Sequence, residues 1–234
     1  MKKVGFIGAY DKTDLILYIA RIITEIGKSV LVIDSTRNQR AKYIVPVINT
    51  FASYITNFEG IDVAVGLFTY EDLKNYLGIG PASPLPYDYV LIDADTTAEI
   101  NRFGLLDDDV KNFFVTSFDF YSLKRGLEII SGLEKPIKIT KIVFSKVMSS
   151  AEDDYLNFLS VGHNIVWEKK QIYFPLDTED QSVIIENQRF SKIKLRGLSG
   201  AFKDSLIFVA NYIMGDEANK NDLRRAVRNL ERGV

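Results

Sequence analysis

The residues with the clearest chemical potential lie in one segment near the N-terminus, Gly8-Ala9-Tyr10-Asp11-Lys12-Thr13. A lysine supplies positive charge for a phosphate, a threonine hydroxyl can bind magnesium, and a helix N-terminus offers free backbone N–H groups to an anion. Glycines normally let those N–H groups converge on the phosphates. Here Ala9 and Tyr10 carry side chains, and the Asp11 carboxylate would repel a phosphate at close range. The turn alone therefore favours a helix N-terminus capped by Asp11 or Thr13 over a phosphate site, and leaves both open.

The hydrophobic pattern on either side of this segment predicts the elements that would position it. Val4–Gly8 and Ser29–Asp34 are short, almost wholly apolar runs, which is typical of parallel strands buried on both faces. Between them, Thr13–Ile26 has apolar residues at helical spacing. The three form a βαβ unit, whose crossover should be right-handed. Since ligands bind at the carboxyl ends of parallel strands, the segment lies where a site is expected.

The alternation of strands and helices continues to the end of the chain. Further strands are predicted at Ile61–Leu67, Tyr87–Asp93, Phe113–Thr116, Ile139–Val147 and Gln171–Leu176. Further helices are predicted at Ala41–Phe51 (interrupted by Pro46), Tyr70–Leu77, Phe120–Leu133, Asp153–Leu159 and Ser199–Met214. We therefore expect a single three-layer α/β domain over residues 1–215, with a mostly parallel, doubly wound sheet. Residues 216–234 are expected to form a polar linker and a short basic helix.

Composition excludes several classes of function. The chain of 234 residues has no cysteine, so disulfides and thiolate chemistry are excluded, and its single histidine, His163, is expected in a loop or at a helix end. A net charge of −2 argues against direct nucleic-acid binding. No apolar run reaches the roughly 20 residues that span a bilayer, so we expect a cytoplasmic protein. Backbone, lysine, aspartate and hydroxyl chemistry remains, and this is the chemistry of phosphate binding.

The order of elements resembles that of the deviant P-loop NTPases of the MinD/ParA family. The segments that carry the resemblance combine a strand with the polar residues that follow it: Gly8–Thr13, Val30–Ser35, Tyr87–Asp93, Ile142–Lys146 and Tyr173–Asp177. The third is similar to the family's Walker B strand, and the last two are similar to its adenine-side strand and proline loop. The resemblance covers about residues 2–215 and lies in the order of elements more than in strict motifs.

The resemblance implies a role for individual residues. The positions that keep the family's residue type are Lys12 for the phosphates, Thr13 for magnesium, Asp34 after the second strand and Asp93 for Walker B. Four positions are changed: the signature lysine falls on Ile7, a glycine on Asp11, the water-activating acid on Thr36 and the adenine-reading asparagine on Ser145. The implied nucleotide site comprises Gly8, Asp11, Lys12, Thr13, Asp34, Asp93, Ser145 and Pro175, with Mg²⁺ at Thr13, Asp34 and Asp93 if ATP binds.

The kept residues also have purely structural interpretations. Asp34 and Asp93 can be polar strand ends, and Lys12 can be a solvated residue of the first helical turn. Four matches at one crevice nevertheless favour a retained site geometry.

Because the changed positions include groups needed for the chemical step, the leading hypothesis is a degenerate member of this family. It would bind ATP and Mg²⁺ weakly or not at all. It would dimerise and serve a partner machine, in pilus, secretion, conjugation or plasmid and chromosome partition systems. The alternative is an active ATP-hydrolysing switch. A different Rossmann-like enzyme is disfavoured because the first turn has no Gly-x-Gly-x-x-Gly fingerprint.

The C-terminal segment, Asp222–Val234, carries more basic than acidic residues, and its apolar residues fall at helical spacing. Some MinD-like proteins end in a basic amphipathic helix that lies on membranes. In this chain the apolar face is small and lacks aromatic residues. We therefore favour a solvated helix packed on its own domain or on a partner over peripheral membrane attachment.

Overall fold

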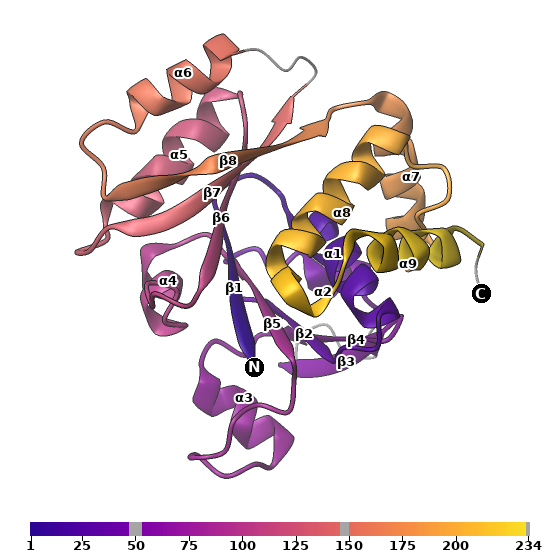
Figure 1. The fold of residues 1–234 in the computed structure, drawn as a ribbon. Helices are drawn as coiled ribbons and strands as arrows, with labels where there is room; N and C mark the ends of the chain where they lie inside the picture. Colours follow the sequence, from indigo (N-terminus) through magenta and orange to yellow (C-terminus); the bar gives the residue numbers. More distant parts are fainter. Residues whose placement is uncertain (47–52, 146–149, 233–234) are drawn as a thin grey trace.

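The computed structural model describes residues 1–46, 53–145 and 150–232. The described residues form one eight-stranded sheet in the order β3-β4-β2-β5-β1-β6-β7-β8. Within it β3 pairs antiparallel with β4, and the other pairs are parallel. Helices cover both faces (Figure 1), which confirms the predicted three-layer α/β architecture.

Strands and helices alternate along most of the chain. The strands are β1 (Lys2–Ile7), β2 (Val30–Asp34), β3 (Tyr54–Phe58), β4 (Ile61–Val65), β5 (Tyr89–Ala94), β6 (Lys111–Ser117), β7 (Ile137–Ser145) and β8 (Ile165–Pro175). The helices are α1 (Thr13–Glu25), α2 (Ala41–Ile44), α3 (Tyr70–Leu77), α4 (Thr97–Arg102), α5 (Phe120–Ser131), α6 (Ser150–Leu159), α7 (Thr178–Arg189), α8 (Gly200–Met214) and α9 (Lys220–Arg232), with a 3₁₀ turn η1 at Gly215–Glu217.

Four elements were missing from the sequence-based expectation: β3, α4, α7 and the 3₁₀ turn η1, which falls where a linker was expected. Strand β8 also begins six residues earlier than expected, because the Glu168-Lys169-Lys170 run breaks its apolar pattern. The pairing with β7 shifts register at this run and resumes at Gln171. Parts of two predicted elements, residues 47–51 and 146–147, lie outside the described residues, as do residues 233–234 of the predicted tail helix. His163 lies between α6 and β8, as expected, with its Nδ1 2.6 Å from the Ser131 hydroxyl.

The sheet is buried on both faces, so it has two hydrophobic cores. One core packs the sheet against α1, α8 and α9, and includes Val4 and Phe6 of β1. The other packs it against α3, α4, α5 and α6, and includes Ile7 of β1. Because successive side chains of a strand point to opposite faces, β1 contributes to both cores. It is a central strand, so its carboxyl end lies in the middle of the row formed by the carboxyl ends of the parallel strands.

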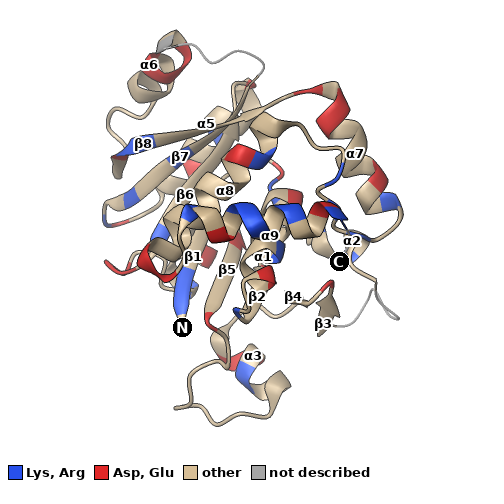
Figure 2. Ribbon diagram, turned by 45° about the vertical axis from the view of Figure 1, so that its right-hand side comes forward, with Lys and Arg blue, Asp and Glu red and all other residues tan. Residues whose placement is uncertain are grey.

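Helix α9 belongs to the first of these cores. Its apolar residues Leu223, Ala226, Val227 and Leu230 are buried with residues of α1 and α8. The helix begins at Lys220, inside the expected linker, and its arginines are exposed. Figure 2 shows the basic segments along α9 in blue. The apolar face that was weighed as a membrane contact is therefore used inside the molecule. Among the described residues, no helix combines the length and apolarity needed to cross a bilayer.

Candidate functional site

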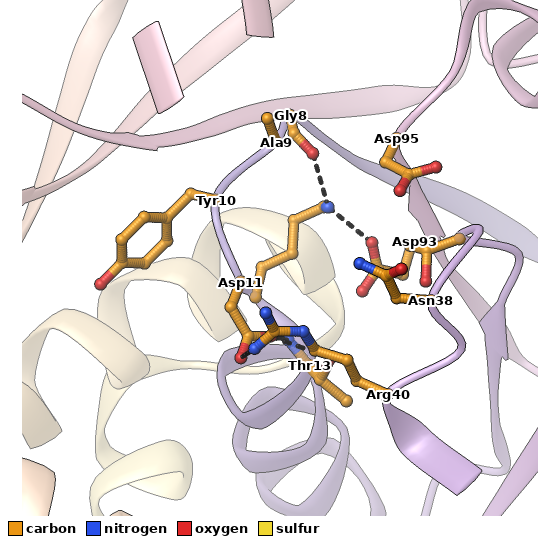
Figure 3. A pocket seen from close by; sticks show the side chains of 11 residues that line it. Gly8, Ala9, Tyr10, Asp11, Thr13, Asn38, Arg40, Asp93 and Asp95 are labelled. Atoms are coloured by element: carbon orange, nitrogen blue, oxygen red, sulfur yellow. Dashed lines mark hydrogen bonds and ion pairs between the residues drawn. The ribbon is translucent and has the colours of Figure 1, made fainter. Parts of the chain in front are cut away.

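The carboxyl ends of three neighbouring central strands bring the predicted site residues together. Strand β5 lies between β1 and β2, and Asp93 of β5 is in register with both Phe6 and Asp34. The first turn follows β1 directly and leads into α1. A small polar pocket opens there (Figure 3), and its lining residues are Gly8, Ala9, Tyr10, Asp11, Lys12, Thr13, Thr36, Asn38, Arg40, Asp93 and Asp95.

Gly8 sets the path of the first turn. Its φ is +143°, and a Cβ at this position would lie 2.3 Å from the Val115 carbonyl oxygen of β6. An L side chain would therefore be strained by its backbone conformation and would collide with a neighbouring backbone as well. Glycine at this position allows the chain to leave β1 close to β6 and to reach the start of α1.

Lys12 turns inward and is buried. Its Nζ lies 2.6 Å from Asp93 Oδ1 and donates a hydrogen bond to the Gly8 carbonyl oxygen at 2.9 Å (Figure 3). Burial raises the pKa of Asp93 to about 7, while the Lys12 charge acts in the opposite direction. The interpretation of Lys12 as a solvated residue is therefore wrong. Lys12 and Asp93 form a buried ion pair in this polar pocket.

Asp11 holds the start of α1. Its Oδ1 accepts hydrogen bonds from the Thr13 backbone N–H at 3.2 Å and from the Thr13 hydroxyl at 3.1 Å. The prediction that Asp11 or Thr13 is the N-cap is wrong: the N-cap is Lys12, whose side chain makes no capping hydrogen bond, and Asp11 binds the first helical residue from one position earlier. Its Oδ2 forms an ion pair with Arg40, which comes from the segment between β2 and α2. Arg40 was missed by the sequence reasoning, because no periodic pattern places that segment beside the first turn.

Asp34 is a buried strand end that caps the short helix α2. Its Oδ1 accepts hydrogen bonds from the backbone N–H and the hydroxyl of Thr36, the latter at 2.6 Å, and its Oδ2 accepts one from the Ala41 N–H at 2.8 Å. Burial raises the pKa of Asp34. Thr36 stands where the resemblance predicts a water-activating acid, and its hydroxyl is bound to Asp34 instead. Asp95, also missed, accepts a hydrogen bond from the Arg37 N–H at 3.3 Å.

Ser145 and Pro175 lie apart from this pocket, at the ends of β7 and β8 where they are register partners. Beside them the Tyr10 ring stacks on Phe144 with centroids 4.8 Å apart. Tyr10 and Phe144 also line a second, more apolar pocket of about 220 Å³ between α1 and α7. Asp14 lies in that pocket and accepts a hydrogen bond from Gln188 at 2.6 Å. Burial, followed by the charge of Asp11, raises the pKa of Asp14 to about 7.

The structure therefore divides the predicted site residues into three groups. Gly8, Asp11, Lys12, Thr13 and Asp93 line one pocket. Asp34 adjoins that pocket through Thr36, and Ser145 and Pro175 lie outside it. Over residues 1–46, 53–145 and 150–232, no group of three or more His, Cys, Asp or Glu side chains could hold a metal ion. Magnesium bound with a nucleotide takes only one or two protein carboxylates, so Thr13, Asp34 and Asp93 remain a possible ligand set only together with phosphates.

Comparisons with known proteins identify the fold. No protein-family model matches the chain, and no curated protein matches it. Among solved structures it is similar to the MinD cell division protein of Aquifex aeolicus, with a TM-score of 0.60 and 18% identity over 94% of this chain and 99% of that one. It is also similar to the septum site-determining protein MinD of Pyrococcus horikoshii complexed with Mg-ADP (TM-score 0.56, 16% identity, 94% and 98% covered). A third is a ParA family ATPase of Chlorobium tepidum (TM-score 0.54, 16% identity, 90% and 99% covered). The chain thus has the fold of the MinD and ParA ATPases over nearly its whole length.

Proposed function

We propose that this chain is a MinD/ParA-like protein with a degenerate phosphate-binding turn, which dimerises and positions or assembles part of a larger cellular machine. Pilus, secretion, conjugation and partition machines are the candidates. Its ATP hydrolysis is weak or absent. The observation that carries the proposal is the buried Lys12–Asp93 pair, in which the expected phosphate-binding lysine is already neutralised by the expected Walker B carboxylate.

The chemical step lacks its usual groups. Phosphoryl transfer depends on positioned positive charge and on an oriented water molecule. Ile7 is fully buried in the core, where the resemblance predicts a lysine that reaches a partner's phosphates. Thr36 offers no carboxylate, and its hydroxyl is bound to Asp34. These two positions support the loss of hydrolysis independently of the turn.

Two features support binding to other proteins. One of the solved structures with this fold is a MinC:MinD cell division protein complex (TM-score 0.56). Beside the polar pocket, the exposed ring of Tyr43 on α2 offers apolar area to a second copy. The proposal includes a cytoplasmic location, and gives α9 no role in membrane insertion because its apolar face is buried.

Calorimetric titration of the protein with ATP and Mg²⁺ tests the degenerate site. We expect a dissociation constant in the millimolar range or no heat, together with no steady release of phosphate. Micromolar binding with steady turnover would overturn the proposal.

Sedimentation tests the dimer. Tyr43→Glu should shift the chain toward monomer, while Tyr76→Glu on α3 should not, since both tyrosines are exposed but only Tyr43 adjoins the crevice. Wild-type protein that stays monomeric at high micromolar concentration would count against dimerisation.

An active ATPase switch is the second candidate, favoured by one observation: Lys12, Thr13 and Asp93 line the same pocket, with Asp34 beside it. In that case ATP would have to displace the Asp93 carboxylate from Lys12. This candidate predicts nucleotide-dependent dimerisation that Lys12→Ala abolishes. A Lys12→Ala variant that dimerises like the wild type would exclude it.

A further inference from the structure

We propose that the Asp11 carboxylate is an internal substitute for a phosphate group, and that this side chain, in addition to the Lys12–Asp93 pair, keeps the polar pocket closed to anions. The inference rests on the proposed function, since it deepens the account of why the nucleotide site is weak. It assigns the specificity of the pocket to one residue and predicts that removing that residue opens the site.

The first argument is that Asp11 occupies the donors that a phosphate would need. It accepts hydrogen bonds from the backbone N–H and the hydroxyl of Thr13, which opens α1. It also pairs with the Arg40 guanidinium. A backbone N–H at a helix N-terminus, a hydroxyl and an arginine fork are the groups that bind phosphate oxygens in proteins. All three are held by one carboxylate of this chain.

The second argument concerns the charge of the pocket. Its lining includes two cations, Lys12 and Arg40, and three carboxylates, Asp11, Asp93 and Asp95. Each cation is already paired with a carboxylate of the same lining. An incoming anion therefore meets an excess of negative charge and two cations that are already paired. Asp11→Gly would equalise the charges and release one cation, Arg40.

Arg40 gives the proposal its sharpest consequence. Arginine is always charged and can bind phosphate oxygens through two parallel hydrogen bonds. Its partner Asp11 is part of the first turn, so a released Arg40 would stand beside the free Thr13 N–H and hydroxyl. The gain of anion binding in Asp11→Gly should therefore depend on Arg40.

Inorganic tripolyphosphate is the probe, because it tests phosphate recognition without a contribution from the base. Titration calorimetry would compare the wild type with Asp11→Gly, and circular dichroism would verify that each variant is folded. A charge-assisted hydrogen bond corresponds to roughly a tenfold change in affinity or more, so we expect Asp11→Gly to bind at least about tenfold more tightly. The double variant Asp11→Gly/Arg40→Ala should lose that gain.

Asp95→Gly is the matched control, because it removes an equal charge from the same pocket while leaving Asp11 on its donors. It should change affinity by less than about threefold, a limit below the effect of one charge-assisted hydrogen bond. If Asp11→Gly does not fold, Asp11→Asn removes the charge and keeps an acceptor for Thr13. That variant should show a smaller gain.

Three results would overturn the inference: folded Asp11 variants that bind no better than the wild type, an equal gain in Asp95→Gly, or a gain that survives the loss of Arg40. Failure of the proposed function gives a different result. It would be seen as micromolar ATP binding and turnover by the wild-type protein.

Discussion

Replacing Lys12 by methionine is the most direct perturbation of the crevice. Methionine keeps most of the length and apolar volume of the lysine stem but carries no charge. In the wild type the Lys12 and Asp93 side chains are only 2% and 4% exposed, and their charged atoms lie 2.6 Å apart. The substitution therefore leaves the Asp93 carboxylate buried without a counter-ion, and we expect the free energy of unfolding to fall.

The expected loss of stability in Lys12→Met follows from the burial of the Lys12–Asp93 pair. Removing one partner of a buried ion pair costs about 3–5 kcal/mol, because the remaining charge has lost both water and its partner. Asp93 can escape this cost by taking up a proton. Its pKa is already raised to about 7, and the loss of the Lys12 charge should raise it further. The penalty of Lys12→Met should therefore be largest at pH 8 and much smaller at pH 5.5.

The sign of the pH effect can be worked out from proton binding. Between the unfolded pKa of an aspartate, about 3.9, and the folded pKa, the native state holds one more proton than the unfolded state. Stability then falls with rising pH by about 1.4 kcal/mol per pH unit. For Asp93 this fall should end near pH 7 in the wild type, where its folded pKa lies. In Lys12→Met it should continue above pH 7.

Urea denaturation at pH 5.5, 7 and 8 would measure these differences. The control is the double variant Lys12→Met/Asp93→Asn, which leaves no unpaired charge and should recover most of the stability lost at pH 8. A loss below about 1 kcal/mol at pH 8, the size of an exposed ion pair, would refute the reasoning. So would a double variant that is as unstable as the single one.

Three further predictions concern the surroundings of the site. In the wild type, the raised Asp14 pKa of about 7 means that the native state holds an extra proton below that pH, so the free energy of unfolding should fall as the pH rises from 5 toward 7. Asp14→Asn should make this fall between pH 5 and 8 less steep, and urea denaturation across this range measures the slope. Gly8→Ala should lower the free energy of unfolding by at least about 2 kcal/mol, because the alanine has an unfavourable positive φ and its added Cβ also collides with the Val115 carbonyl oxygen. Gly27→Ala should cost only about 1 kcal/mol, because its φ is also positive but no atom lies within 4 Å of the added Cβ; chemical denaturation measures both values. Leu223→Ala should lower stability by about 2–5 kcal/mol and Arg224→Ala by less than about 0.5 kcal/mol, because only the leucine is buried against the domain; an equal effect of the two would contradict the packing of α9.

Elements with a strong local pattern could be predicted from the sequence. Helix α3 has the predicted bounds, Tyr70–Leu77, because Thr69 caps its start and Gly78 ends it with a φ of +66°. Helix α7 was missed because its sequence is mostly polar and contacts distant in sequence hold it in place. Its Asn187 donates to the Tyr18 hydroxyl at 2.6 Å, and its Asp180 accepts from the Ser199 hydroxyl at 2.8 Å. Such contacts leave no periodic signal in the segment itself.

In the site as well, some features could be predicted from the sequence and others depend on contacts between distant segments. Strand order was enough to bring Lys12, Asp34 and Asp93 to one crevice, since parallel strands end at the same edge. The ion pair of Asp11 was not predictable, because its partner Arg40 comes from the segment between β2 and α2. Asp34 shapes that loop by capping α2, and so helps to place Arg40 beside Asp11. Only the opposite charges of Arg40 and Asp11 could have suggested the contact.

In the function that we propose, phosphate binding and hydrolysis are weakened by different physical changes in this pocket. We propose that Asp11 closes the phosphate position from the pocket side, through hydrogen bonds to Thr13 and one ion pair with Arg40 that a single substitution removes. At the position where the resemblance implies a catalytic lysine, Ile7 is fully buried and lies in the same core as Phe114. A lysine restored at Ile7 would bury an uncompensated ammonium, which costs several kcal/mol. The proposal therefore predicts that one substitution in the pocket lining improves anion binding, whereas a gain of hydrolysis would require changes in the core beneath the pocket.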